Sequence, residues 1–174
     1  HRLRKLQNGV VTTLAGGEHG FADGPAATAR FNLPRGLALD AQGRVLVADE
    51  DNYRVRRVTS EGETTTIGGA DGPRIEGYSR GIMTARDGTV FVSTWLDSNK
   101  ILTLSADGTV TTLAGAGERG FADGRGAAAA FNWPMGIAEG PDGHIYVADK
   151  NNDSIRRGTR AGAGTTVAGR PAGR

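Results

Sequence analysis

The stretch VTTLAGGEHGFADG at residues 11–24 is repeated almost letter for letter as VTTLAGAGERGFADG at residues 110–124. Self-similarity of this kind is the sequence signature of repeat architectures, so the duplication guides the interpretation of the whole chain. Each copy begins with β-branched residues that favour a strand and ends with the turn-forming pair Asp-Gly. The two copies therefore mark equivalent points in related structural units.

Short strands separated by glycine-containing turns follow the first copy. They are LPRGLALD at 33–40, RVLVAD at 44–49, NYRVRRV at 52–58 and ETTTIGG at 63–69. This pattern predicts an antiparallel four-stranded meander over 33–69, and the same order recurs over 80–115 and 133–169. Residues 1–16 predict two leading strands that end a preceding unit. The whole chain is expected to be a single domain of these units.

A repeat of about 40 to 50 residues with four strands is typical of a β-propeller blade. Gly36, Gly81 and Gly136 open the three units. We therefore predict an all-β fold with about three four-stranded blades plus two leading strands. A β-solenoid is the main alternative, but its rungs are usually shorter and would not turn at Asp-Gly pairs each time. The loop at 20–32 is predicted to contain one short helix.

Two long segments carry a family resemblance. NLPRGLALDAQGRVLVADEDNYRVRRV at 32–58 and NWPMGIAEGPDGHIYVADKNNDSIRRG at 132–158 resemble the NHL repeat, with its N-x-P-x-G-[IL]-A opening and its V-A-D-x-x-N-x-x-[IV]-R core. The resemblance implies a propeller, commonly six-bladed, that binds proteins, RNA or other partners on its faces. The resemblance also includes enzymes, the amidating lyases, which hold zinc with histidines on the propeller axis, and none of those ligands can be matched to this sequence.

The middle unit departs from the pattern. Ser93-Thr94 stands where the other units have Ala48-Asp49 and Ala148-Asp149, so we interpret it as a degenerate blade. Three and a half blades do not close a ring, and each blade buries its faces only against its neighbours. We expect a segment of a longer, six-bladed ring, because RPAGR follows the last strand where another blade should begin. Self-association and missing blades are the alternatives.

Composition limits the classes of partner. The chain has 174 residues, a formal net charge of +2 and no cysteine, so disulfides and thiolate metal sites are excluded. A dedicated nucleic-acid-binding domain usually carries a clustered excess of basic residues, so nucleic acid is an unfavoured partner. We find no apolar run long enough to span a membrane and no signal peptide in the sequence as given.

Several recurring polar residues are candidates for a site. Asp49, Asn52, Asp149 and Asn152 recur at one spacing and could form an acidic metal cluster. We predict instead that they cap turns and satisfy backbone N–H groups, because a structural role explains the recurrence. Asp23 and Asp123 are similarly interpreted as turn or helix-start residues, with calcium binding in the loop as an alternative.

Aromatic and basic residues form a second set of candidates. Phe21, Phe31, Phe121 and Phe131 could line a ligand pocket, but we predict that they fasten the loops as core. The possible interaction surface consists of Arg54, Arg56, Arg57, Arg156, Arg157 and Tyr53. These arginines could hold phosphates, and strand alternation divides them between two faces, which favours a solvated blade surface.

Catalysis has little support in the sequence. The three histidines are His1, His19 and His144, and the last two align with arginines in the related units. We therefore predict a non-catalytic scaffold without a cofactor or metal, which presents its loop faces to a protein partner. An RNA-binding propeller, and a propeller lyase or hydrolase with a metal in the central channel, are the alternatives.

Overall fold

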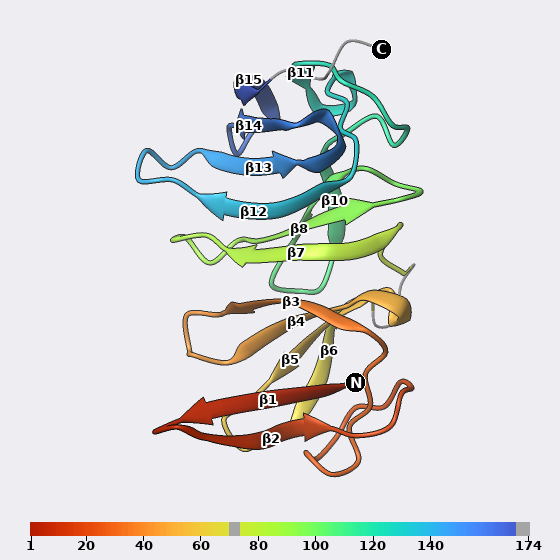
Figure 1. Cartoon of the computed structure of the whole chain (residues 1–174), viewed down its shortest axis with the longest axis vertical. Coiled ribbons are helices and arrows are strands. Elements are labelled where there is room, and N and C mark those ends of the chain that lie inside the picture. The colour runs from red at the N-terminus through yellow and green to blue at the C-terminus, as the bar shows by residue number, and fades with distance from the viewer. Residues whose placement is uncertain (70–73, 170–174) are drawn as a thin grey trace.

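The structure is a computed structural model that describes residues 1–69 and 74–169 (Figure 1). These residues form four antiparallel sheets and contain three 3-10 helices but no α-helix. The all-β prediction is therefore confirmed. The sheets follow one another along the long axis of the molecule, from the N-terminal hairpin to the last sheet (Figure 1).

Each sheet is a meander of neighbouring strands. The N-terminal hairpin pairs β1 (Arg2–Gln7) with β2 (Val10–Gly16). Blade 1 contains β3 (Pro34–Leu39), β4 (Val45–Asp49), β5 (Arg54–Val58) and β6 (Thr64–Gly68). Blade 2 contains β7 (Tyr78–Thr84), β8 (Val90–Trp95), β9 (Ile101–Leu104) and β10 (Val110–Ala114). Blade 3 contains β12 (Pro134–Glu139), β13 (Ile145–Asp149), β14 (Ser154–Gly158) and β15 (Ala163–Gly169).

Blade 3 has a fifth strand that the sequence pattern did not predict. The two-residue strand β11 (Gly124–Arg125) comes from the loop before the blade and pairs with the outer strand β15. In blade 1, Gly24 of the matching loop forms a single bridge with Thr64 of the outer strand. The GFADG segments thus cover the edge strands, which would otherwise present unpaired backbone groups.

The short helix expected at 20–32 is reduced to a turn. In the first copy, the backbone N–H groups of Thr28 and Ala29 both donate to the carbonyl oxygen of Pro25, and no helix forms. The second copy forms the 3-10 helix η2 (Gly126–Ala128). Glycine and proline at these positions limit the helix to one turn, although the neighbouring alanines favour a longer one.

Apolar side chains form one core between each pair of neighbouring sheets. Leu46, Val55, Ile82 and Val92 belong to the core between blades 1 and 2. A second core fills the space between blades 2 and 3, and a third joins the N-terminal hairpin to blade 1. Each blade therefore depends on its neighbours for burial, as expected for stacked repeats.

The inner strands of adjacent blades approach closely at glycine. A Cβ atom placed on Gly36 of β3 would lie 2.5 Å from the carbonyl oxygen of Arg80 on β7. A Cβ atom on Gly81 would collide with the carbonyl oxygen of Met135 on β12 and lie 2.7 Å from Ser93 Oγ. Glycine is thus required where the backbone of one blade meets the next.

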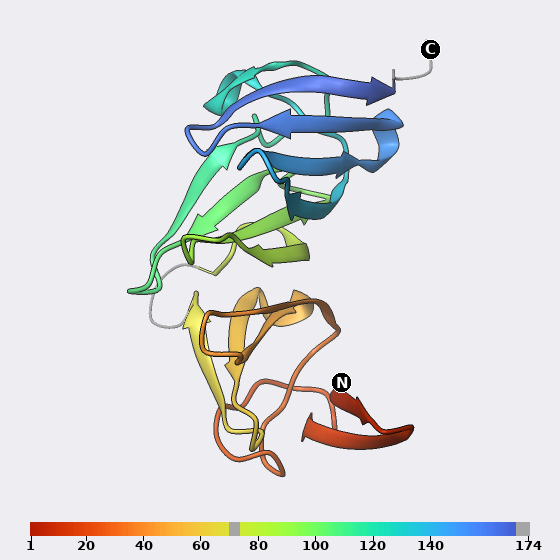
Figure 2. The same cartoon turned by 90° about the vertical axis from the view of Figure 1, so that its left-hand side faces the viewer.

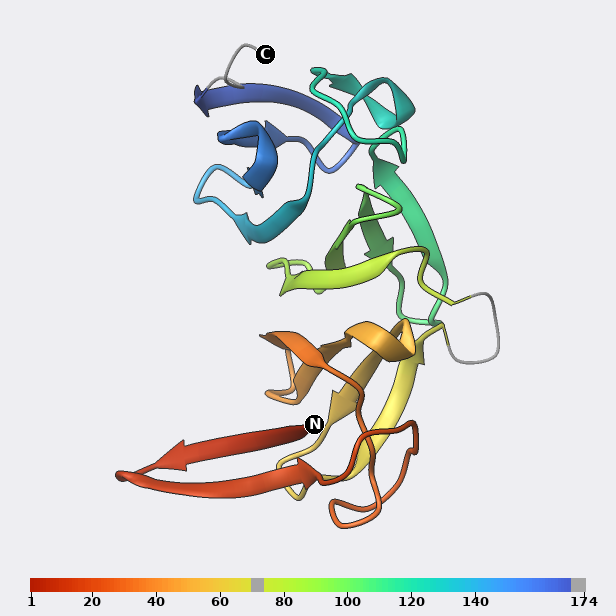
Figure 3. The same cartoon turned by 45° about the vertical axis from the view of Figure 1, so that its right-hand side comes forward.

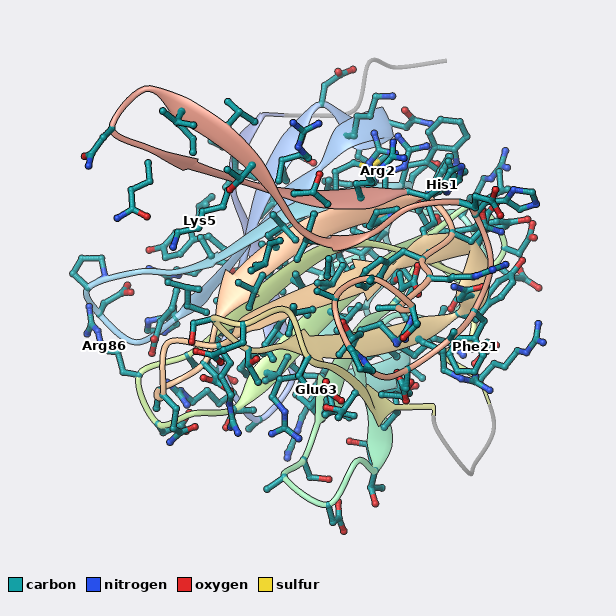
Figure 4. The ribbon with its side chains drawn as sticks, turned by 90° about the horizontal axis from the view of Figure 1, so that it is seen from below. His1, Arg2, Lys5, Phe21, Glu63 and Arg86 are labelled. Carbon is teal, nitrogen blue, oxygen red and sulfur yellow. The ribbon has the colours of Figure 1, made fainter. Side chains whose placement is uncertain are left out.

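The propeller has two faces at opposite ends of the strands. We define the loop face as the one that carries η1 (Glu50–Asn52), residues 96–99, η3 (Lys150–Asn152) and the loops that lead into each blade. The opposite face carries the turns between the first two strands of each blade. Figures 2 and 3 show these two sets of connections from two further directions. In Figure 4, His1 and Phe21 lie on one side of the molecule, and Lys5 and Arg86 lie on the other.

An arginine on the opposite face locks blade 3 to blade 2. Arg160, in the turn before β15, donates to Asp87 of blade 2 and to Glu139 of its own blade. The backbone N–H of Arg86 also donates to Glu139, at 2.8 Å. We call these four residues the Arg160 lock.

The Arg160 lock should depend on pH. The hydrogen bond from Arg160 lowers the pKa of Asp87 from 3.8 to about 2. A carboxyl group whose pKa is lower in the folded state stabilises the fold when the pH is above its pKa in the unfolded chain. This contribution is lost as the pH falls through the pKa of the folded state. We therefore expect Arg160→Ala to lower the urea midpoint at pH 7, with the difference from the native chain shrinking between pH 4 and pH 2. Equal differences at pH 7 and pH 2 would contradict this role.

Candidate functional site

The recurring Asp-x-x-Asn-x-x-x-Arg residues form a buried network rather than a metal cluster or a local turn cap. Asp49 Oδ1 accepts from the backbone N–H of Asn32 at 2.7 Å. Its Oδ2 accepts from Asn52 Nδ2 at 2.7 Å and from an Arg56 nitrogen at 2.8 Å. Asn52 also donates to the carbonyl oxygen of Gly20. The side chains do satisfy backbone groups, but these groups belong to the leading loop and not to the adjacent turn.

Arg56 is the centre of this network. Its guanidinium group is fully buried and donates to the carbonyl oxygens of Arg30 and Ala22, at 2.9 and 2.7 Å. It also donates to Asp23, whose carboxylate accepts from the backbone N–H of Thr66 on β6. Asp23 therefore ties the loop to the blade instead of starting a helix. Because Arg56 is buried, its assignment to an interaction surface was wrong.

Two phenylalanines enclose the guanidinium group. The Arg56 Cζ atom lies 4.8 Å from the ring centroid of Phe21 and 5.1 Å from that of Phe31. Phe31 is fully buried, whereas Phe21 is 53% exposed, so the prediction of core is wrong for Phe21. The physical reason is that Phe21 covers the guanidinium group from the solvent side, where a flat ring and a cation attract each other.

Blade 3 repeats this arrangement. Arg156 donates to Asp149 at 2.9 Å and to Asp123 at 2.7 Å, and it is 2% exposed. Asn152 donates to Asp149 and to the carbonyl oxygen of Gly120. Phe121, 40% exposed, and the buried Phe131 lie on either side of the arginine. Arg156 and Phe121 therefore need the same corrections as Arg56 and Phe21.

Blade 2 lacks the network as a whole. The strand pairing puts Thr94 in the place of Asp49 and Leu102 in the place of Arg56. Both partners of the ion pair are replaced together, and the GFADG loop that they would hold is missing as well. This agrees with the rule that a buried charge needs its partner, since either residue alone would be left uncompensated.

The loop face carries a continuous row of four aromatic side chains. Tyr53 and Tyr78 have ring centroids 5.3 Å apart, and Tyr78 and Trp95 have centroids 6.1 Å apart. Trp95 meets Trp133 edge to face at 4.9 Å. These residues come from all three blades and are half-buried. We call them the aromatic row.

A buried carboxylate supports the middle of the row. Glu50 is 2% exposed and accepts from the Trp95 indole N–H at 3.1 Å and from Arg35 Nε at 3.2 Å. Arg80 lies 3.9 Å from the same carboxylate and 5.7 Å from the Trp95 ring centroid. Trp95 is therefore held in one orientation by both charge and hydrogen bonding.

Cations flank both ends of the row. Arg74 lies over Tyr53 at 5.7 Å, while Arg119 and Lys150 lie over Trp133 at 5.6 and 5.1 Å. The neighbouring Tyr78 hydroxyl group, together with partial burial, raises the pKa of Tyr53 to about 12. Tyr53 therefore stays neutral at physiological pH. The row presents partly exposed rings bordered by positive charge.

The comparisons with known proteins agree with this architecture. The NHL repeat family matches residues 31–58. Protein SUPPRESSOR OF QUENCHING 1, chloroplastic, of Arabidopsis thaliana is 30% identical over 168 residues. Residues 31–58 are therefore an NHL repeat, and the chain has a β-propeller fold of the NHL type. The resemblance inferred from the sequence is therefore confirmed.

Solved structures similar to this NHL chain are also propellers. Virginiamycin B lyase from Staphylococcus aureus matches 95% of the chain with a TM-score of 0.65 and 16% identity. An auxiliary nutrient binding protein from Bacteroides thetaiotaomicron matches 92% with a TM-score of 0.69 and 19% identity. A chain of the nidogen/laminin complex matches 95% with a TM-score of 0.66 and 19% identity. At these identities the likeness shows the fold alone.

The NHL chain is shorter than all of these proteins. The aligned region includes 84% of this chain but only 16% of the Arabidopsis relative. It spans 48% of the lyase chain, 38% of the nutrient binding protein and 57% of the chain from the nidogen/laminin complex.

The remaining sequence candidates in the NHL chain are dispersed. Arg54 is half-buried beside Tyr53, and burial lowers its pKa. Arg57 lies between blades 1 and 2, and Arg157 is exposed on the last blade. The basic surface proposed from the sequence is thus not contiguous. Sequence reasoning included Tyr53 but missed the other three members of the aromatic row, because no local motif links them.

Two searches of the described residues gave negative results. Residues 1–69 and 74–169 contain no group of three or more His, Asp or Glu side chains placed to hold a metal ion. No helix in the same residues has the length and apolarity needed to cross a membrane.

Proposed function

We propose that this NHL propeller is a non-catalytic interaction module that binds a protein partner through the aromatic row on its loop face. One observation carries the proposal: four rings from three blades form one surface bordered by cations. Aromatic residues and arginine are enriched in protein interfaces, where they supply most of the binding energy. The Glu50 contacts orient Trp95 before a partner arrives, which reduces the entropy lost on binding.

The charges around the row favour a protein over a nucleic acid. Exposed Glu76 and Glu118 belong to the same loops as Arg74 and Arg119, and exposed Asp97 lies in the loop that follows Trp95. A phosphate backbone would be repelled by these carboxylates, whereas a protein surface can match both signs. The buried position of Arg56 and Arg156 removes the basic stripe on which the RNA alternative rested.

The positions of the histidines support a binding role over a catalytic one. The rings of His1 and His19 lie 5.7 Å apart near the N-terminal end of the chain. His144 lies 3.1 Å from Asp142 in a turn on the opposite face. Virginiamycin B lyase shares the fold, and at 16% identity this likeness concerns the fold alone.

The proposal can be tested with peptides selected from a random library displayed on phage. We expect the selected peptides to combine acidic and apolar side chains. Their affinity should fall about tenfold or more for Trp133→Leu, which installs the residue that blade 1 has at Leu33, because a well-packed ring is a typical hot spot. Lys150→Glu should weaken binding by charge repulsion. Fluorescence anisotropy of the labelled peptides gives the dissociation constants.

Lys5→Glu is the matched control, because Lys5 lies on the exposed N-terminal hairpin, across the molecule from His1 and Phe21 (Figure 4). It should leave peptide affinity unchanged. Equal losses for Lys5→Glu and Lys150→Glu would show that binding is not at the aromatic row. Binding of single-stranded oligonucleotides, with loss on Trp133→Leu and no selected peptide, would make nucleic acid the partner class instead.

A further inference from the structure

A cleft of about 610 Å³ opens between blades 1 and 2 on the face opposite the aromatic row. Its floor is apolar and consists of Leu46, Ile67, Val90 and Leu104, of which all but Ile67 are buried core residues. Turn residues from both blades form the rim. Volumes of roughly 300–1,000 Å³ with apolar walls are typical of sites for small organic molecules.

The Arg160 lock joins blades 2 and 3. The cleft lies at the equivalent place between blades 1 and 2, where the residues that form the lock are replaced. The matching turn of blade 2 carries Ala106 in the place of Arg160, and blade 1 carries Gln42 in the place of Asp87. No ion pair can form between a methyl group and an amide, so the turns of blades 1 and 2 are not joined there. Ala106 and Gln42 both line the cleft.

One cation in the cleft has no charged partner among the residues that the structure describes. Asp40 accepts from Arg44 at 2.7 Å, and Asp87 accepts from Arg160, so these charges are already paired. Arg57 lines the cleft, and its guanidinium group has no hydrogen-bonding or ion-pair partner within residues 1–69 and 74–169. It pairs across the sheet with Leu46, which places its guanidinium group beside the apolar floor.

We propose that this cleft binds a small organic anion, with a single carboxylate, sulfate or sulfonate group on an apolar body. The acidic group pairs with Arg57, and the apolar body covers the Leu46, Val90 and Leu104 side chains. A half-buried arginine forms stronger hydrogen bonds to an anion than an exposed one because less water competes. The site is separate from the aromatic row, so its failure would leave the proposed function unaffected.

A matched pair of fluorescent probes tests the charge requirement. 8-Anilinonaphthalene-1-sulfonate and N-phenyl-1-naphthylamine share the same rings and differ by the sulfonate group. We expect the native chain to bind the sulfonate about tenfold more tightly, as one charge-assisted hydrogen bond provides. Arg57→Gln should remove this difference and leave the affinity for the neutral probe unchanged. Arg157→Gln, at the equivalent exposed position of blade 3, should change neither affinity.

A second variant tests the location. Ala106→Arg combined with Gln42→Asp copies the Arg160 lock into the cleft and should abolish binding of both probes while the amide NMR spectrum remains that of a folded chain. In the native chain, the sulfonate should shift the amide signals of Val90, Thr103 and Leu104. Equal affinities for the two probes, equal effects of Arg57→Gln and Arg157→Gln, or shifts confined to the exposed residues Leu37 and Leu39 would each overturn the proposal.

Discussion

Replacing Arg56 with leucine is expected to lower the free energy of unfolding by about 3–5 kcal/mol, because it leaves the buried carboxylate of Asp49 without its cation. Two carbonyl oxygens of the leading loop, at Ala22 and Arg30, lose their donors at the same time. Urea denaturation followed by circular dichroism measures the loss. Arg57→Gln, one residue away and half-buried, should stay within about 0.5 kcal/mol of the native chain.

Blade 2 provides a control for the energetic coupling between Asp49 and Arg56. The double variant Asp49→Thr with Arg56→Leu copies Thr94 and Leu102, and it should be less destabilised than the sum of the single variants by about 1–3 kcal/mol. Additive effects would show that the two residues act independently.

The Arg56→Leu effect should also depend on pH. Burial raises the pKa of Asp49 above 3.8, and removing Arg56 takes away a hydrogen bond that opposes this shift. A carboxyl group with a raised pKa binds more protons in the folded state, so stability increases as the pH falls through that value. We therefore expect the destabilisation to be smaller near pH 4 than at pH 7. A destabilisation that grows as the pH falls would contradict the burial of Asp49.

Gly81→Val is expected to destabilise the chain by about 3 kcal/mol or more. The added side chain would collide with the backbone of Met135 and with Ser93, and two inner strands cannot separate without opening the core between blades 2 and 3. Gly36→Val should behave similarly because of the carbonyl oxygen of Arg80. Thermal unfolding measures both losses.

Gly136→Val is the matched control at the equivalent position of blade 3. A Cβ atom there would meet only Ala148, at an ordinary 3.7 Å, so we expect a change within about 1 kcal/mol. From the sequence alone, valine at Gly36 or Gly136 is expected to harm folding more than valine at Gly173, because Gly36 and Gly136 open strands near the crowded propeller axis. The structure revises this for Gly136, and Gly173 lies outside the described residues. Equal shifts for Gly81→Val and Gly136→Val would contradict the close approach of the blades.

The amino-acid sequence by itself determined the strands, their meander order and the NHL family. These properties follow from local chemistry: β-branched runs favour strands, Asp-Gly and Asn-Gly pairs favour turns, and the copy at 110–124 repeats the copy at 11–24. The same pattern correctly identified the second unit as a degenerate blade, because Thr94 stands where the other two units have aspartate. It also identified Asp49 and Asn52 as residues that satisfy backbone groups.

Only the tertiary structure decided what those residues contact. The alternating pattern of its strand predicts that Arg56 is a surface cation. In the structure, the loop carbonyl oxygens that it contacts lie 26 and 34 residues away, in the leading loop that folds back over the blade. The aromatic row joins Tyr53 to Trp133 across three blades, and the cleft depends on a contact that Arg160 makes and Ala106 does not. The physical reason is common to all three: each feature forms between elements distant in sequence, where burial and charge pairing depend on how neighbouring blades meet.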